Sequence, residues 1–134
     1  MRITFVGFGL LASSVAAAIK QAKLPTVVRA VSSPATLTRA KELGLADEFF
    51  GYDEIKDWVP GSDVILLCAP ILHILKTIDA LSQMDLAALA GQNQILVSDI
   101  GSTKVEICKA GAKLPEPFVF VGSHPMAGSE KRTL

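Results

Sequence analysis

The sequence predicts an α/β fold of the doubly wound, Rossmann-like type, with a parallel sheet of about six strands in the order 3-2-1-4-5-6. Short apolar runs alternate with helical segments along the chain, a pattern typical of parallel strands joined by right-handed helical crossovers. A glycine-rich turn follows the first apolar run, where the first helix of such a fold begins. The length of 134 residues suits one domain with one core.

The first half of the chain is predicted to form a βαβαβ unit. Its first apolar run shows no alternation, as expected for a strand covered on both faces. Proline suits the first turn of the second helix and glycine its end. The expected strands are Ile3–Val6, Val27–Val31 and Glu48–Phe50, and the expected helices are Leu10–Ala22 and Pro34–Gly44.

The second half repeats this alternation. Thr103 and Glu106 match the S/T-x-x-E capping box, which predicts a helix that begins at Thr103. The other expected elements are the strands Val64–Cys68, Ile95–Ser98 and Phe118–Val121 and the helix Pro70–Leu81.

The composition favours a compact domain with a small-molecule partner. Half of the residues are hydrophobic and 19% are charged. Thirteen basic residues balance thirteen acidic ones and are scattered, so neither a nucleic acid nor an anionic membrane is an expected partner. Cys68 and Cys108 lack CxxC spacing, so we expect buried thiols in a reducing compartment, with no disulfide and no metal site.

The first twenty residues imitate a secretory signal, with a positive residue, an apolar run and an alanine-rich end. However, Gly7 and Gly9 interrupt the run where a strand would turn into a helix, and cleavage after Ala16 or Ala18 would remove the expected central strand. We therefore predict a cytoplasmic protein without a transmembrane helix.

The turn VGFGLLAS predicts dinucleotide binding. Gly7 permits the tight turn, Gly9 lets the backbone approach a pyrophosphate, and Ala12 keeps the helix close to its strand. GxGxxA alone is a weak signal, and a merely structural glycine turn is the alternative, but the position between a strand and an alanine-rich helix favours the cofactor. The expected contacts are Gly7, Phe8, Gly9, Leu10, Leu11 and Ala12.

The end of the second strand bears on the choice of cofactor. An acidic residue there accepts a hydrogen bond from the ribose 2′-hydroxyl of NAD and repels the 2′-phosphate of NADP. This chain has Ser32, Ser33 and Thr36 instead, with Arg39 nearby, which favours NADP over NAD. Alternatively, these residues only cap the helix that begins at Pro34.

Two further loops are predicted to reach the ligand crevice. Cys68, Ala69 and Pro70 follow the fourth strand, where small residues admit a cofactor, although Pro70 also suits a purely structural role. Ser102 follows the fifth strand with a free hydroxyl that could contact substrate or nicotinamide, and Gly101 beside it is expected to contact the cofactor. His73 is expected to be an ordinary helix residue.

The stretch GSHPMAGSE follows the sixth strand and contains His124. Imidazole can accept a proton from a substrate hydroxyl near neutral pH, as a dehydrogenase requires. Pro125 favours an extended backbone at His124, which would direct its side chain. The residues alone leave two alternatives open, namely catalysis and stabilisation of the loop.

Together, GFGLLASS, LLCAPI, VSDIGSTK and VGSHPMAGSE resemble the nucleotide-binding domain of the prephenate and arogenate dehydrogenases of tyrosine biosynthesis. The resemblance implies that His124 accepts the hydrogen bond or the proton of the ring hydroxyl during hydride transfer and loss of CO₂. It implies that Ser102 orients His124 and the substrate, and it aligns Glu130 with an acid near the active-site mouth.

The resemblance also implies a partner domain. In that family a helical domain with the dimer interface and much of the substrate pocket follows, whereas this chain, 1–134, is expected to be the dinucleotide-binding domain alone. We therefore expect the isolated chain to bind cofactor, to turn over slowly or not at all and to show an exposed apolar patch, and we expect a homodimer in the full-length protein. The alternatives are another NAD(P)-dependent hydroxyacid or imine reductase and a nucleotide-binding module without catalysis.

Overall fold

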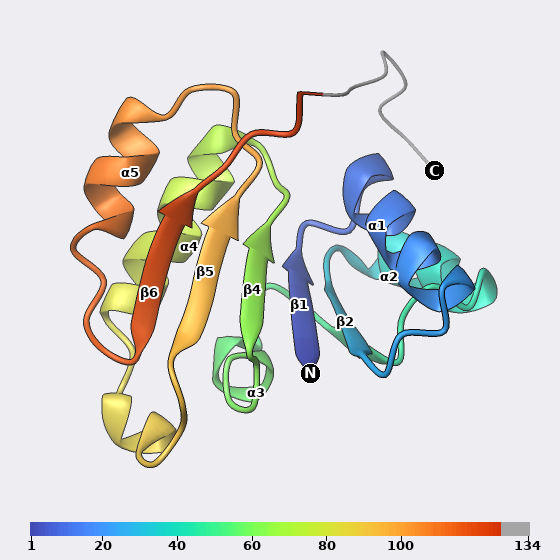
Figure 1. Ribbon diagram of the computed structural model, residues 1–134, viewed down its shortest axis with the longest axis horizontal. Coiled ribbons are helices and arrows are strands. Elements are labelled where there is room, and N and C mark those ends of the chain that lie inside the picture. Colours follow the sequence, from blue (N-terminus) through green and yellow to red (C-terminus); the bar gives the residue numbers. More distant parts are fainter. Residues whose placement is uncertain (127–134) are drawn as a thin grey trace.

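The structure, a computed structural model, describes residues 1–126. Its core is a six-stranded parallel sheet in the order β3-β2-β1-β4-β5-β6, as predicted (Figure 1). The strands are β1 (Arg2–Val6), β2 (Val27–Val31), β3 (Glu48–Phe50), β4 (Val64–Leu67), β5 (Ile95–Asp99) and β6 (Phe118–Gly122). The helices are α1 (Leu10–Gln21), α2 (Pro34–Glu42), α3 (Ile55–Trp58), α4 (Ile71–Ser82) and α5 (Val105–Gly111), with a short 3₁₀ helix, η1 (Leu86–Leu89).

Every strand and helix expected from the sequence is present, and each predicted end either coincides with the observed one or differs from it by one or two residues. The sequence did not predict α3 and η1, since four residues are too few to show a helical period. The capping box at Thr103 was wrong. Lys104 occupies the N-cap position with helical backbone angles and makes no side-chain cap hydrogen bond. The loop before α5 instead folds around the carboxylate of Asp99, so the helix begins two residues later.

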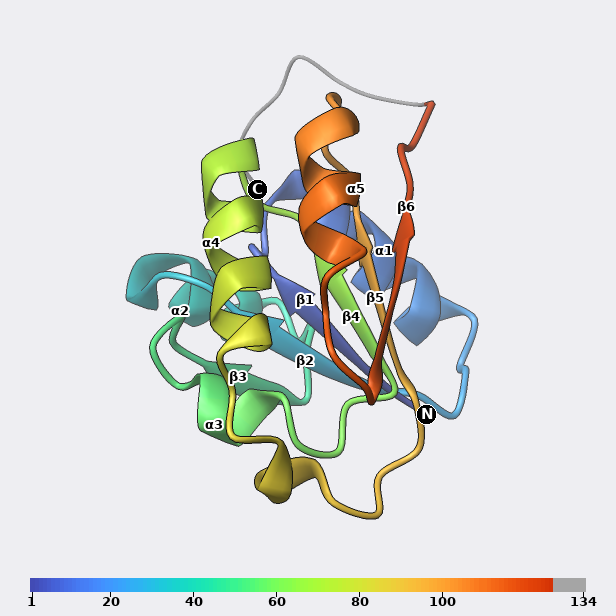
Figure 2. The ribbon, with the colours of Figure 1, turned by 90° about the vertical axis from the view of Figure 1, so that its left-hand side faces the viewer.

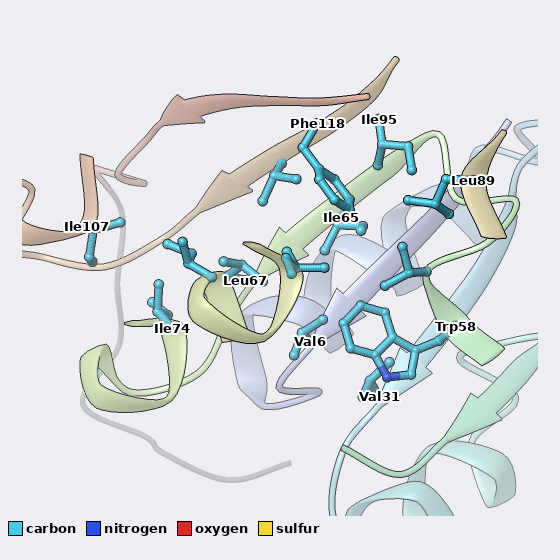
Figure 3. Packing of buried hydrophobic residues seen from close by; sticks show 14 residues of the cluster. Val6, Val31, Trp58, Ile65, Leu67, Ile74, Leu89, Ile95, Ile107 and Phe118 are labelled. Atoms are coloured by element: carbon cyan, nitrogen blue, oxygen red, sulfur yellow. The ribbon is translucent and has the colours of Figure 1, made fainter. Parts of the chain in front are cut away.

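Two apolar layers sandwich the sheet. On one face α1 and α2 pack on β1 and β2, and α1 contributes the small buried residues Ala12 and Ala16, which let the helix lie close to the sheet. On the other face α4 and α5 lie side by side (Figures 1 and 2). There α3, α4 and α5 contribute the fully buried Trp58, Ile74 and Ile107 (Figure 3). Full burial of each aliphatic side chain of this kind stabilises the fold by about 1.5–3 kcal/mol.

One stretch of the sheet is apolar and open. Leu96 of β5 and Val119 of β6 face each other in register and are each 37% exposed, and Val121 is 52% exposed. These side chains alternate with the buried residues of the same strands and therefore lie on the face opposite α4 and α5. The expected exposed apolar patch is thus present, on β5 and β6.

Within residues 1–126, no helix has the length and apolar character needed to cross a membrane.

Candidate functional site

The loops predicted to bind ligand all follow the carboxyl ends of parallel strands, so they lie along one edge of the sheet (Figure 1). At this edge the turn after β1 packs tightly against the loop after β4. Gly7 has a φ of +93°, and a Cβ atom there would lie 2.8 Å from both the Ala69 nitrogen and the Cys68 carbonyl carbon. Gly7 is therefore required by the fold itself.

Gly9 differs from Gly7. It is the N-cap of α1 with φ −84° and ψ −161°, angles open to any residue, and a Cβ atom would meet nothing within 4 Å. The first helical hydrogen bond runs from the Ser13 amide to the Gly9 carbonyl at 3.0 Å, so the amides of residues 10–12 precede the helical ladder. With no cap side chain, these amides and the positive end of the helix dipole can receive an anion such as a pyrophosphate.

The other residues of this turn divide into backbone and packing roles. Phe8 is fully buried and its ring packs edge-to-face on Phe5 at 5.9 Å, so only the Phe8 main chain could contact a cofactor. Leu10 and Leu11 are half-buried in the first turn of α1. Ala12 is fully buried, in accord with the close helix–sheet approach expected at this position.

The end of β2 carries hydroxyl groups instead of an acid. Ser32 is buried, and its amide donates to the Phe50 carbonyl at 3.1 Å. Ser33 is the N-cap residue of α2, but its hydroxyl makes no cap hydrogen bond and lies 3.1 Å from the Thr36 hydroxyl. The capping alternative therefore does not account for the Ser33 side chain. Arg39 pairs with Glu42 at 3.5 Å on the surface of α2.

The loop after β4 continues the same edge. The Cys68 amide donates to the Val6 carbonyl at 2.7 Å, and Pro70 is the N-cap of α4, which begins one residue later than predicted. Both cysteines are free thiols. Burial, and then the negative charge of Asp99, raise the pKa of the Cys68 thiol to about 12, so it is neutral at physiological pH.

A cavity of about 260 Å³ lies between α3 and α4 beside the end of β1. His73 on its rim stacks edge-to-face on Tyr52, with ring centroids 6.0 Å apart. Trp58 lines the cavity, and its buried indole nitrogen has no hydrogen-bond partner among residues 1–126. The remaining lining residues are Val6, Ile55, Lys76, Thr77 and Ala80.

Ser102 and His124 are exposed residues of the loops after β5 and β6. These strands are in register to their ends, where Asp99 pairs with Gly122, so the two loops leave the sheet side by side. His124 follows the strand three positions from β1, which corresponds to about 14 Å across the sheet at the usual strand spacing. Glu130 lies outside the described residues.

Sequence reasoning missed the group that joins these loops. Asp99 is fully buried and accepts hydrogen bonds from the Gly101 amide at 2.8 Å and from the Lys104 ammonium group. It also accepts one from the Ser123 amide at 3.3 Å. The sequence did contain a signal, because Asp99 ends a mostly apolar strand. A carboxylate buried there needs several hydrogen-bond donors, which the following loops would have to supply. No group of three or more metal-ligating side chains occurs in the described part of the chain.

The fold and the open glycine-capped helix define a Rossmann-like nucleotide-binding domain. Residues 15–133 match the family described as the nucleotide-binding domain of prephenate dehydrogenase. The chain belongs to this family, so the resemblance inferred from the four motifs is confirmed.

Curated relatives agree with this assignment. The chain is 30% identical over 132 residues to the prephenate dehydrogenase of Lactococcus lactis, an alignment that covers 97% of this chain and 35% of that protein. It is 33% identical over 130 residues to the cyclohexadienyl dehydrogenase of Zymomonas mobilis, covering 96% and 41%. The chain thus spans about two fifths or less of the length of these relatives.

Solved structures lead to the same family. The chain superposes with a TM-score of 0.77 and 25% identity on a prephenate dehydrogenase from Aquifex aeolicus, crystallised with hydroxyphenyl propionate and NAD⁺. That comparison covers 99% of this chain and 44% of the other. An arogenate dehydrogenase from Synechocystis gives a TM-score of 0.75 at 27% identity, covering 98% and 43%.

Proposed function

We propose that this chain is the cofactor domain of an NAD(P)-dependent enzyme that oxidatively decarboxylates prephenate to 4-hydroxyphenylpyruvate or arogenate to tyrosine. The observation that carries the proposal is the common edge of the sheet, to which a glycine-capped helix and the loops of Ser102 and His124 all contribute. The family supports the same chemistry.

In this proposal His124 acts as the proton acceptor. As the ring hydroxyl becomes a carbonyl-like oxygen, its proton passes to the imidazole, while Ser102 donates or accepts a hydrogen bond that orients the hydroxyl. NAD(P), held at the first turn of α1, would supply the acceptor for the hydride that leaves the same carbon, and the ring carboxylate would leave as CO₂. Aromatisation of the ring drives that loss, and the electron pair of the broken carbon–carbon bond leaves the ring oxygen as a phenolate. The protonated His124 would return its proton to that oxygen, so no further acid or base is required. Glu130 is proposed only as an acid near the entrance.

The cofactor would lie with its pyrophosphate at the amides of the first turn of α1. Contacts are proposed from the main chain of Gly7, Phe8 and Gly9, from the first turn of α1 through Ala12, and from Cys68, Ala69, Pro70 and Gly101. The apolar cavity beside Val6, which Trp58 also lines, suits the adenine ring.

We infer a preference for NADP over NAD. The end of β2 offers the hydroxyls of Ser33 and Thr36 and no carboxylate to repel a 2′-phosphate. The Aquifex aeolicus structure was solved with NAD⁺, so related proteins do use the smaller cofactor. Titration of the chain with both nucleotides tests the preference, and clearly tighter binding of NAD⁺ would reject it.

We also infer that the active protein is a cytoplasmic homodimer in which a second, helical domain completes the substrate pocket. Support comes from the length of the relatives and from the open apolar strip of Leu96, Val119 and Val121. Sedimentation velocity of the full-length gene product tests this, since a monomer at micromolar concentration would contradict it.

The main test incubates the full-length gene product with both substrates and both cofactors and follows the absorbance of the reduced nicotinamide. We expect NAD(P)H formation with prephenate or arogenate and none with simple hydroxyacids or imines. His124→Asn should abolish turnover and leave cofactor affinity unchanged. Equal turnover in His124→Asn would favour a nucleotide-binding module without this catalytic role.

A further inference from the structure

We propose that Asp99, neutralised by Lys104, is a positioning residue that holds the Ser102 loop and the His124 loop in one fixed arrangement. The inference rests on the proposed function, because it assigns the alignment of the two proposed active-site loops to a single buried carboxylate. Asp99 touches neither Ser102 nor His124 directly and acts through their neighbours.

The two carboxylate oxygens of Asp99 serve different loops. Oδ2 accepts the Gly101 amide at 2.8 Å and the Lys104 ammonium group, and these two residues flank Ser102 and Thr103. Oδ1 accepts the amide of Ser123, the residue immediately before His124, at 3.3 Å. The Asp99 carbonyl also accepts the Ser123 hydroxyl at 2.5 Å. One residue therefore restrains both loops within one or two residues of the proposed active groups.

The surroundings are shaped to admit the carboxylate. A Cβ atom at Gly101 would lie 2.9 Å from Asp99 Oδ2 and 2.6 Å from Ile107 Cδ1, and one at Gly122 would lie 2.7 Å from the Cys108 sulfur. Both glycines border Asp99: Gly101 lies in the loop after β5, and Gly122 is the last residue of β6. Larger residues at either position would displace the loop or the carboxylate, so the sequence at this corner of the sheet fits the hydrogen-bond network.

The energetic argument points the same way. Asp99 is fully buried, and the Lys104 side chain is 30% exposed. Burying an ion pair often stabilises a protein less than apolar packing of the same volume would, so such a pair is a poor choice for stability alone. The ion pair instead fixes the orientation of the groups bonded to it, because charged hydrogen bonds are short and geometrically strict. Misplacement of a reacting group by about 1 Å costs about 100-fold in rate, so fixed loops have a catalytic consequence.

Asp99→Asn is the direct test. An amide has one acceptor oxygen and one donor NH₂ group, so either Ser123 or the Gly101 and Lys104 pair must then face a donor. In the full-length gene product, we expect turnover of the preferred substrate to fall by about 10- to 100-fold. The loss of NAD(P) affinity should be much smaller, because Gly101 is only one of the proposed cofactor contacts. The matched control is Asp47→Asn, which also removes a carboxylate that bonds a lysine and a backbone amide, but far from the site.

Substitutions of Lys104 provide a second test. Lys104→Met should lower turnover in the same way, and Lys104→Arg should restore most of it by keeping the charge. The control is Lys109→Met, which removes a lysine of α5 paired with Glu106 on the surface, at 67% exposure. Parallel losses of turnover, cofactor affinity and melting temperature in Lys104→Met would overturn the positioning role in favour of a purely structural one.

A third readout needs neither substrate nor cofactor. In ¹⁵N relaxation experiments on this chain, we expect the order parameters of Ser102, His124 or both to fall below about 0.6 in Asp99→Asn and Lys104→Met. Native values at both residues in a folded Asp99→Asn protein would overturn the inference. Loss of order in the variants, with no turnover by the full-length gene product carrying the native residues, would instead count against the proposed function, so the two failures are distinguishable.

Discussion

At the scale of single residues, Gly7 and Gly9 belong to one motif but serve different purposes. Gly7 combines a positive φ with a 2.8 Å approach to the backbone of the neighbouring loop, so the fold itself excludes a side chain. Gly9 has ordinary backbone angles and open space around it. Nothing in the described structure requires glycine there, which leaves the approach of a ligand as the reason.

Substitution by alanine should separate these roles. Gly9→Ala should leave the free energy of unfolding unchanged within about 0.5 kcal/mol and weaken NAD(P) binding by about tenfold or more, which corresponds to about 1.4 kcal/mol. Gly7→Ala should lower the free energy of unfolding by about 2–3 kcal/mol. Urea unfolding and calorimetric titration measure both quantities. Unchanged affinity in Gly9→Ala would remove the case for a pyrophosphate at α1.

Cys68 should be chemically inert despite its place beside the proposed site. Because the pKa of Cys68 is raised to about 12, its reactive thiolate is scarce in the folded protein at pH 8.5. In the unfolded chain the thiolate forms at a much lower pH. In a Cys108→Ala background, alkylation by iodoacetamide at pH 8.5 should be at least about tenfold slower in the native protein than in urea. Equal rates would show that the thiol is accessible and ionisable.

At the scale of elements, one buried cation joins β2, β3 and α3. Arg29 bonds Glu48 of β3 at 2.7 Å and donates to the carbonyls of Trp58 and Pro60 at 3.1 and 2.9 Å, where α3 ends. Its guanidinium also lies 5.6 Å from the centre of the Phe50 ring. The short helix α3, which the sequence did not predict, is thus held by tertiary contacts.

Loss of this cation should therefore be costly. Arg29→Met keeps the apolar stem but removes the partner of Glu48 and the donor to the Pro60 carbonyl, while the Trp58 carbonyl keeps the Ser62 hydroxyl as a donor. We therefore expect a loss of about 3 kcal/mol in the free energy of unfolding. Thermal or urea unfolding measures it, with Arg39→Met on the surface of α2 as the control that should cost less than about 0.5 kcal/mol. A similar small cost for Arg29→Met would contradict the bridging role.

The stability that Asp47 provides by joining α1 to β2 should depend on pH. Burial opposes ionisation of Asp47, but hydrogen bonds from Lys20 and the Val28 amide, with the Lys20 charge, lower its pKa overall below the ordinary value. The lowered pKa of Asp47 stabilises the fold fully at pH values above the unfolded-state pKa of about 3.9. This stabilisation is lost as the pH falls through the lower pKa of the folded state. The difference in melting temperature between the native chain and Asp47→Asn should shrink between about pH 5 and pH 2. A constant difference would contradict this linkage.

At the scale of the whole molecule, this chain supplies only part of the proposed active site. The described residues supply the cofactor edge and two loops, and the chain spans 35% and 41% of two dehydrogenase relatives. We therefore expect the chain to bind NAD(P) but to turn over far more slowly than the usual enzyme range of about 1–1,000 per second. Steady-state assays on the isolated chain test this, and a rate within that range would contradict it.

The sequence by itself determined the strand order and the family, and it predicted the edge of the sheet at which a ligand would bind. Alternation of apolar runs with helices is a local pattern, and parallel connections have one strongly preferred hand, so Val64–Leu67 and the other strands follow from short-range information. The turn from Gly7 to Ala12 and the motifs around Ser102 and His124 were likewise recognisable, because their residue types and spacing are contiguous in the chain.

Only the tertiary structure decided how those motifs are held. Asp99 bonds a residue 24 positions later, and Arg29 bonds carbonyls 29 and 31 positions away, so no local pattern reports either network. The same cause explains the wrong capping box at Thr103, since the long-range demand of a buried carboxylate for donors outweighs a cap worth about 1 kcal/mol. Local sequence thus specifies which main strands and helices form, whereas long-range hydrogen bonds to buried charged groups determine where these elements end and how their loops fold.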